Sequence, residues 1–158
     1  EQYVKYSYVF LELGFEIPSI VADIGCGTGL LIEFLEKHGI DRFDKYICVE
    51  PSIGMLSRVL SKRLVDHRVI VIRGYGEELP LSDQSVDAVY AFTVLGNVVD
   101  PAKFVGELLR IVRDTGYVLL SLHEKTPRKD VYEEYLEKRG FIKIGCSIDC
   151  YYLWTSNG

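Results

Sequence analysis

The sequence lacks any run of apolar residues long enough to cross a membrane. Its longest notable uncharged stretch extends from Ala88 to Val99, whereas a membrane-spanning helix needs about 20 residues. The opening residues, EQYVKYSYVF, also lack the basic start and apolar centre of a secretory signal peptide. We therefore expect a cytoplasmic protein with no membrane partner. The chain begins at Glu1 rather than at a methionine, so whether the native protein extends further is left open.

A concentration of positive charge is also missing. The chain has 18 Lys and Arg against 23 Asp and Glu, which gives a net charge of −5, and both signs are mixed along the sequence. Proteins that bind nucleic acids usually gather Lys and Arg on one face. The composition therefore argues against a nucleic-acid partner.

Cysteine is scarce and shows no metal-ligand spacing. The four cysteines are Cys26, Cys48, Cys146 and Cys150. Cys146 and Cys150 lie four residues apart, but no second pair accompanies them as in a zinc site. We expect all four to be reduced thiols that serve as small buried side chains, and we expect no metal.

Strand-like and helix-like stretches alternate along a chain whose length predicts one domain, residues 1–158. Strands are predicted at Ser19–Ile24, Lys45–Glu50, Arg68–Ile72, Val86–Phe92, Gly116–Leu122, Phe141–Ile148 and Tyr151–Thr155. Helices are predicted at Thr28–His38, Ile53–Leu64, from the Asp100-Pro101 cap through Val112, and at Asp130–Arg139, the last with an Asp130…Glu133 capping pattern. A further helical segment, residues 1–16, is expected over the ligand edge of the sheet.

The alternation predicts an α/β fold with parallel strands and helices on both faces. The last two strands are separated by a hairpin-length turn, so they must pair antiparallel. The prediction is a doubly wound, mostly parallel, seven-stranded sheet with an antiparallel C-terminal hairpin. Residues 19–122 would form a cofactor-binding core, and residues 130–156 would form the closing helix and hairpin.

The stretch VADIGCGTGLL, from Val21 to Leu31, joins the first strand to the first core helix. Its glycine spacing is G-x-G-x-G, and Leu30 stands where a dinucleotide site has its third glycine. Asp23 lies just before the glycines, and a carboxylate there would repel a pyrophosphate. It would attract a cationic ligand such as S-adenosylmethionine, which carries an ammonium and a sulfonium but no phosphate.

Glu50 ends the second predicted strand. An acid at this position of an α/β sheet can accept hydrogen bonds from both ribose hydroxyls. Asp23 and Glu50 together favour an adenosyl cofactor with a cationic tail, although two unrelated strand-end acids remain an alternative.

Four ordered motifs resemble those of class I S-adenosylmethionine-dependent methyltransferases, of the small-molecule group (type 11) that includes quinone-biosynthesis enzymes. They are VADIGCGTGLL, VEPSIGML (Val49–Leu56), GYGEELPLSDQSVDAVYAF (Gly74–Phe92) and VLGNVVDPAKFVGELLRIVRDTGYVLLS (Val94–Ser121). The resemblance implies a Rossmann-like fold and methyl transfer from S-adenosylmethionine, with S-adenosylhomocysteine as product. It covers the region from Val21 to Ser121.

The resemblance also implies a set of cofactor-binding residues. Glu50 would bind the ribose, Met55 would lie near the adenine, and the backbone of Phe92 and Thr93 would meet the methionine ammonium. Tyr75 stands where the family often has an acid, and it is expected to stack on or cover the adenine. The full set is Asp23, Gly25, Cys26, Gly27, Thr28, Gly29, Glu50, Pro51, Ser52, Met55, Tyr75, Gly76, Glu77, Phe92 and Thr93.

Two residues are candidates for the acceptor side of the site. Asn97 could orient an acceptor through its amide, and His123 follows the fifth strand and could act as a base. The plainer alternatives are a turn residue and an exposed loop histidine. The Gly96-Asn97 pair replaces a Glu-His pair that the family often has, which leaves the acid–base chemistry open.

The expected function is methyl transfer to a small-molecule acceptor that the sequence does not identify. An alternative is a methyltransferase-fold cofactor-binding or scaffold subunit that needs a partner for activity. A nicotinamide-dependent dehydrogenase is disfavoured by the glycine spacing and by Asp23. The short connection after the fifth strand leaves the acceptor side uncovered. Either the N-terminal segment closes it, or a second chain does, or the acceptor is large, and a homodimer stays open.

Overall fold

A computed structural model of the chain describes residues 1–62 and 66–157. The strands are β1 (Ile20–Ile24), β2 (Lys45–Glu50), β3 (Val69–Arg73), β4 (Val86–Phe92), β5 (Val112–His123), β6 (Ile142–Cys146) and β7 (Asp149–Thr155). The helices are α1 (Gln2–Tyr6), the wider turns of η1 (Ser7–Glu12), α2 (Leu30–Lys37), α3 (Ile53–Ser61), the short η2 (Leu95–Asn97), α4 (Pro101–Ile111) and α5 (Lys129–Lys138). No helix in these two ranges is long and apolar enough to cross a membrane.

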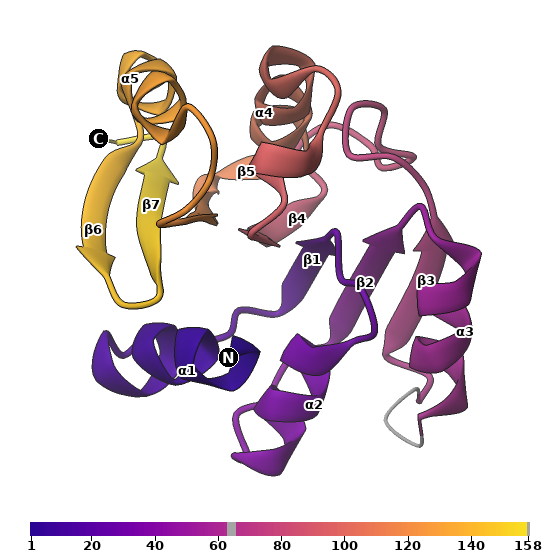
Figure 1. The fold of residues 1–158 in the computed structure, drawn as a ribbon. Coiled ribbons are helices and arrows are strands. Elements are labelled where there is room, and N and C mark those ends of the chain that lie inside the picture. Colours follow the sequence, from indigo (N-terminus) through magenta and orange to yellow (C-terminus); the bar gives the residue numbers. More distant parts are fainter. Residues whose placement is uncertain (63–65, 158) are drawn as a thin grey trace.

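One seven-stranded sheet has the order β3-β2-β1-β4-β5-β7-β6. β1 pairs parallel with both β2 and β4, and β7 pairs antiparallel with both β5 and β6. In Figure 1, α1, α2 and α3 cover one face of the sheet, and α4 and α5 cover the other. The predicted fold class is therefore confirmed, including the antiparallel C-terminal hairpin.

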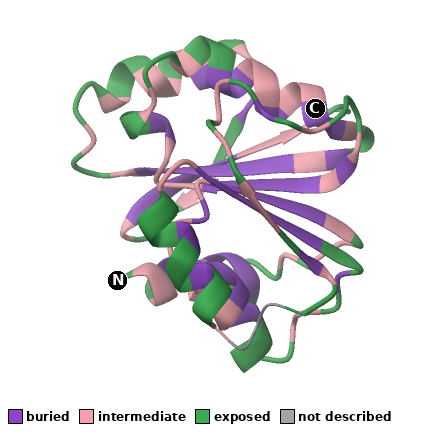
Figure 2. Cartoon of the chain, turned by 90° about the vertical axis from the view of Figure 1, so that its right-hand side faces the viewer, coloured by how far each residue is buried: buried purple, intermediate pink, exposed green. Residues whose placement is uncertain are grey.

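In Figure 2 the largely buried strands lie between two layers of helices. The alternation of side chains along β1 divides the core into two corresponding layers. Ala22 and Ile24 belong to the layer under α4 and α5, whereas Val21 belongs to the layer under α1, α2 and α3. Asp23 follows the period of Val21 and therefore faces the N-terminal helices. Both layers are apolar because a parallel sheet is covered on both faces.

Local capping explains where two helices begin. The side chain of Asp100 accepts a hydrogen bond from the Lys103 amide at 3.0 Å, and proline occupies the first helical position of α4. α3 is capped in the same way by Ser52. Both start sites were predicted from the sequence. The predicted helix through Leu64 ends at Ser61 instead, and Leu64 lies outside the described residues.

The predicted capping pattern at Asp130 and Glu133 is wrong. α5 begins at Lys129, and Arg128 occupies the cap position in a left-handed conformation (φ 56°) with no side-chain cap hydrogen bond. The Glu133 carboxylate instead accepts hydrogen bonds from Tyr152 and Lys143 across the hairpin. Tertiary contacts thus replace a local cap.

The expectation of four reduced thiols is wrong for two cysteines. Cys146 and Cys150 face one another as a cross-strand pair at the end of the β6–β7 hairpin and form a disulfide. Only a short turn separates them, and their Cα atoms lie 4.0 Å apart. Cys26 and Cys48 are buried and free, as predicted.

Phe104 links the helix layer to the site described below. It is fully buried in α4, and its ring lies against the backbone of Gly76. Replacing Phe104 with alanine should lower the free energy of unfolding by about 3–5 kcal/mol, measured by urea denaturation. Lys103→Ala, at the neighbouring exposed position, should change it by less than about 0.5 kcal/mol. Equal stability of the two variants would contradict this packing.

Candidate functional site

The strand order reverses between β1 and β4, and a cavity of about 610 Å³ lies at the carboxyl ends of the strands there. This volume is within the range of small-molecule sites. We call it the main cavity. Its lining residues are Gln2, Ile24, Gly25, Gly27, Glu50, Pro51, Met55, Gly74, Tyr75, Gly76, Glu77, Phe92, Thr93, Val94, Asn97, Val98 and Val99.

The glycine turn after β1 forms the floor of the main cavity. Gly25 and Gly27 have φ angles of +74° and +57°, which side-chain-bearing residues rarely adopt. A Cβ atom at Gly25 would also lie 2.5 Å from the Val94 side chain. The absence of side chains here brings the backbone of the turn to the cavity surface, where a ligand can approach it closely.

Glu50 holds a fixed carboxylate on the wall of the main cavity. Its Oε2 accepts a hydrogen bond from the Gly27 amide at 3.1 Å, and its Oε1 accepts one from the Ser52 amide at 3.0 Å. The residue is 7% exposed, so the carboxylate is oriented rather than solvated. A carboxylate oxygen can accept more than one hydrogen bond. Glu50 can therefore still accept two hydroxyl groups of a ligand.

Asp23 lies beneath the glycine turn and is not among the residues that line the main cavity. It is 3% exposed, and its Oδ2 accepts a hydrogen bond from the Tyr46 hydroxyl at 2.8 Å. Burial raises the pKa of Asp23 to about 7, although the hydrogen bond from Tyr46 opposes the shift. Direct contact between Asp23 and a ligand's ammonium therefore stays a prediction.

Large apolar side chains at the main cavity are unusually exposed. Met55 is 44% exposed, Tyr75 62% and Val99 96%. A ligand in the cavity could cover Met55 and Tyr75, which the sequence predicts near an adenine. Burying such surface is favourable by about 25 cal/mol per Å².

Ten of the fifteen predicted cofactor residues line the main cavity: Gly25, Gly27, Glu50, Pro51, Met55, Tyr75, Gly76, Glu77, Phe92 and Thr93. Besides Asp23, the remaining four are Cys26, Thr28, Gly29 and Ser52. Ser52 caps α3 and donates to Glu50, and Gly29 is the left-handed residue that starts α2. A hydrogen bond with Cys48, together with burial, raises the pKa of Cys26, so it stays a neutral thiol.

A smaller cavity of about 180 Å³ adjoins the main one and shares Thr93 and Asn97 with it. Asn97 donates from Nδ2 to the Thr93 carbonyl at 3.1 Å. His123 also lines the smaller cavity, so the structure brings both predicted acceptor-side residues to this place. We call it the acceptor-side cavity.

The hydrogen bonds of His123 define its tautomer. Its Nδ1 accepts the Lys125 amide at 3.0 Å, so the proton of the neutral ring is on Nε2. Nε2 lies 3.5 Å from a carboxylate oxygen of Glu1. In this arrangement the neutral imidazole can donate a hydrogen bond from Nε2 but has no lone pair left to act as a base.

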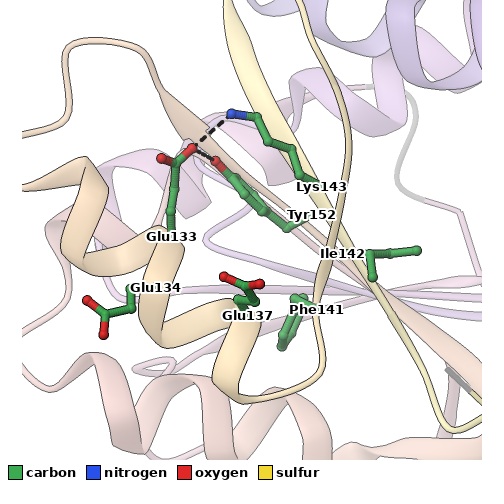
Figure 3. Close-up of a pocket in the computed structure, with 7 residues that line it drawn as sticks. All are labelled: Glu133, Glu134, Glu137, Phe141, Ile142, Lys143 and Tyr152. Atoms are coloured by element: carbon green, nitrogen blue, oxygen red, sulfur yellow. Dashed lines mark hydrogen bonds and ion pairs between the residues drawn. The ribbon is translucent and has the colours of Figure 1, made fainter.

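A third hollow, of about 470 Å³, lies between α5 and the C-terminal hairpin (Figure 3). Its charged side chains include Glu133, which pairs with Lys143 at 3.0 Å and whose pKa is lowered mainly by the hydrogen bond from Tyr152. None of the predicted cofactor or acceptor-side residues lines it. This hollow is therefore separate from the predicted cofactor site.

The residues of the main cavity fit S-adenosylmethionine. The glycine turn lets a ligand approach the backbone closely, and the described residues that line the cavity include no cluster of cations that would favour a phosphate. Glu50 supplies an oriented acceptor for two hydroxyls, and Met55 and Tyr75 supply exposed apolar surface. These three features match the tail, the ribose and the adenine of the cofactor.

The sequence did not indicate every residue of the site. Gln2 reaches the main cavity from α1, and Val94, Val98 and Val99 line it after β4. The only signal for the valines was their place after the strand's carboxyl end. Gln2 had no local signal, because its position depends on how α1 packs.

Comparison with known proteins gives a consistent result. The family model described as "Methyltransferase domain" matches residues 22–120. The chain is 28% identical to the ubiquinone biosynthesis O-methyltransferase of Nitrosomonas europaea, over 82% of this chain and 54% of that protein. It is 32% identical to the ubiquinone/menaquinone biosynthesis C-methyltransferase of Campylobacter jejuni, over 77% and 48%. The chain thus spans about half the length of these relatives.

Solved structures share the fold. The crystal structure of an S-adenosylmethionine-dependent methyltransferase from Aquifex aeolicus superposes with a TM-score of 0.74 and covers 94% of this chain and 88% of that one. The sequence identity is 20%, so this likeness concerns the fold alone.

Asp23 should make stability depend on pH. Its pKa rises from 3.8 to about 7 on folding, so the native state binds the proton more tightly than the unfolded state. The free energy of unfolding should therefore fall as pH rises from about 4 to about 7, by up to about 4 kcal/mol, relative to Asp23→Asn. Urea denaturation across this range measures it. Parallel pH profiles for the two proteins would contradict the buried acid.

Proposed function

Because the chain belongs to the methyltransferase domain family, within the class I S-adenosylmethionine-dependent enzymes of the type 11 group, we propose that it methylates a small-molecule acceptor. S-adenosylmethionine is the cofactor of this family. We propose both this activity and the position that each part of the cofactor takes in the main cavity. This chain covers only 54% and 48% of the two relatives that are named for quinone biosynthesis.

The observation that carries the proposal is the Glu50 carboxylate. Both of its oxygens are held by backbone amides of the cofactor-side loops, at 3.1 Å and 3.0 Å. A carboxylate fixed in this way pays little further entropy to accept two ribose hydroxyls.

The positions of the other parts of the cofactor follow from the proposed contact between Glu50 and the ribose. Met55 and Tyr75 would enclose the adenine, and the Gly25–Gly27 turn would approach the methionine portion. The backbone of Thr93 would lie at the amino-acid end, next to the acceptor-side cavity. Asp23 would act from beneath the turn rather than by direct contact.

When bound, the cofactor supplies an activated methyl group on a sulfonium. The contribution of the protein is mainly to hold donor and acceptor in line and to exclude water, which can supply about 7–11 kcal/mol of the barrier reduction. Asn97 and His123 lie where an acceptor would be oriented. The tautomer of His123 makes it a hydrogen-bond donor to the acceptor rather than its base.

The acceptor is proposed as a small molecule. Two named relatives act in ubiquinone or menaquinone biosynthesis, so quinone precursors are the first class to test. The alternative of a scaffold subunit that needs a partner is not favoured, because these relatives are named as methyltransferases. The decisive assay is transfer of a radiolabelled methyl group from S-adenosylmethionine to a quinone-precursor panel and to a metabolite extract. Donor binding without transfer to any acceptor would count against catalysis by this chain.

Calorimetry tests the cofactor assignment. Wild-type protein should bind S-adenosylhomocysteine and not NAD. Glu50→Ala should weaken S-adenosylhomocysteine binding by about 1.5–3 kcal/mol, or roughly 10- to 150-fold, because charge-assisted hydrogen bonds to the ribose are lost. Glu134→Ala, an exposed carboxylate on α5, is the control and should leave the affinity unchanged. Equal affinities for the two variants would overturn the ribose assignment.

Turnover of a methylated acceptor tests the role of His123. His123→Ala should lower kcat about tenfold with little change in S-adenosylhomocysteine affinity, because one hydrogen bond to the acceptor is lost. His123→Gln should recover most of kcat, since its amide nitrogen can donate from near the position of Nε2. A glutamine variant as slow as the alanine variant would contradict the donor role.

A further inference from the structure

A buried polar cluster joins the N-terminal helix to the end of the cofactor cavity. Its four members are Lys5 of α1, Thr93 after β4, Ser121 of β5 and Asp149 of β7. Lys5 is 1% exposed, and Ser121 and Asp149 are fully buried. We call these four residues the latch. None of the roles assigned so far uses Lys5, Ser121 or Asp149.

The hydrogen bonds of the latch converge on Thr93 and Asp149. The Lys5 ammonium lies 3.0 Å from Asp149 Oδ1 and donates to Thr93 Oγ1 at 2.8 Å. Thr93 Oγ1 donates to Asp149 Oδ2 at 2.7 Å, and Ser121 Oγ donates to the same oxygen at 2.6 Å. Lys5, Thr93 and Asp149 thus each contact at least two other side chains of the latch, and the two opposite charges are buried together.

Thr93 needs such constraint because its backbone is strained. Its φ angle is +60°, a region that β-branched residues rarely occupy. Its amide donates to Ser121, to Oγ at 3.0 Å and to the carbonyl at 3.2 Å. Its hydroxyl is held by Lys5 and Asp149. The surrounding groups therefore determine the conformation of Thr93.

The position of Thr93 affects both cavities. It lines the main cavity and the acceptor-side cavity, and its carbonyl accepts the hydrogen bond that positions Asn97. Lys5 also fixes α1, which carries Gln2 to the main cavity. A change at Lys5 would thus reach the cavity wall without Lys5 touching a ligand.

From this geometry we infer that Lys5 and Asp149 are positioning residues that hold Thr93 in the conformation needed to bind the amino-acid end of the cofactor. The inference rests on the proposed function. It adds that the N-terminal helix is part of the binding machinery and sets affinity for one end of the ligand only. The adenosine end, at Glu50 and Met55, lies outside the latch.

Two ligands separate the two ends of the cavity. S-adenosylhomocysteine carries the amino-acid group, whereas 5′-methylthioadenosine carries the adenine and ribose without it. Lys5→Met removes the ammonium and keeps the length of the side chain. It should weaken S-adenosylhomocysteine binding at least tenfold and change methylthioadenosine binding less than twofold, measured by calorimetry on protein that circular dichroism shows to be folded.

A structural control distinguishes positioning from general loosening. Leu136→Ala truncates a fully buried side chain on α5 away from the cavity. It should leave the ratio of the two affinities as in the wild type. Asp149→Asn should shift the ratio in the same direction as Lys5→Met, and the double variant should shift it no further than the larger single effect, because the two residues act as one unit.

Ser121→Ala provides a milder test if the charge variants do not fold. It removes one donor to Asp149 and one acceptor of the Thr93 amide, so it should weaken S-adenosylhomocysteine binding alone, about threefold or more. Equal weakening of both ligands, or no weakening of either, would overturn the latch and leave the proposed function standing. Wild-type protein that binds neither ligand would overturn both.

Discussion

The parallel pairing of β1 with β2 on one side and β4 on the other determines where the polar groups of the site lie. All three strands end at the same edge, so the glycine turn, Glu50 and Thr93 meet there although they are distant in sequence. The helices that follow the strands leave this edge open. The hydrogen bonds between the strands therefore determine where the site lies, and the side chains at this edge determine what it can bind.

Features that depend on local sequence could be predicted well. The alternation of strands and helices predicted the sheet, and hairpin-length spacing predicted its antiparallel end. The glycine turn and Glu50 were recognised because each follows directly from a strand end. Ten of the fifteen cofactor residues that the family resemblance implies line the main cavity.

Features that depend on packing could not be predicted. The contact of Asp23 with a ligand stays a prediction, and its hydrogen bond with Tyr46 on the neighbouring strand had no signal in the sequence. Glu133 accepts hydrogen bonds from Tyr152 and Lys143 instead of serving in the expected cap. Cys146 meets Cys150 because the hairpin turn lies before Asp149, earlier in the sequence than the strand pattern indicated. Nothing in the sequence indicated that Lys5 pairs with Asp149, because the two residues belong to no common motif.

The latch also bears on the order in which the protein can assemble during synthesis. Lys5 precedes the other latch residues in the sequence and Asp149 follows them, so the counter-charge of Lys5 is made after strands β1 to β5. Strands β1 to β4 and the Glu50 anchor are complete well before β7 emerges from the ribosome. A nascent chain would therefore complete the proposed adenosine-binding half first, before Lys5 of α1 gains its ion pair with Asp149. The half proposed to recognise the amino-acid tail would be completed only once β7 is made.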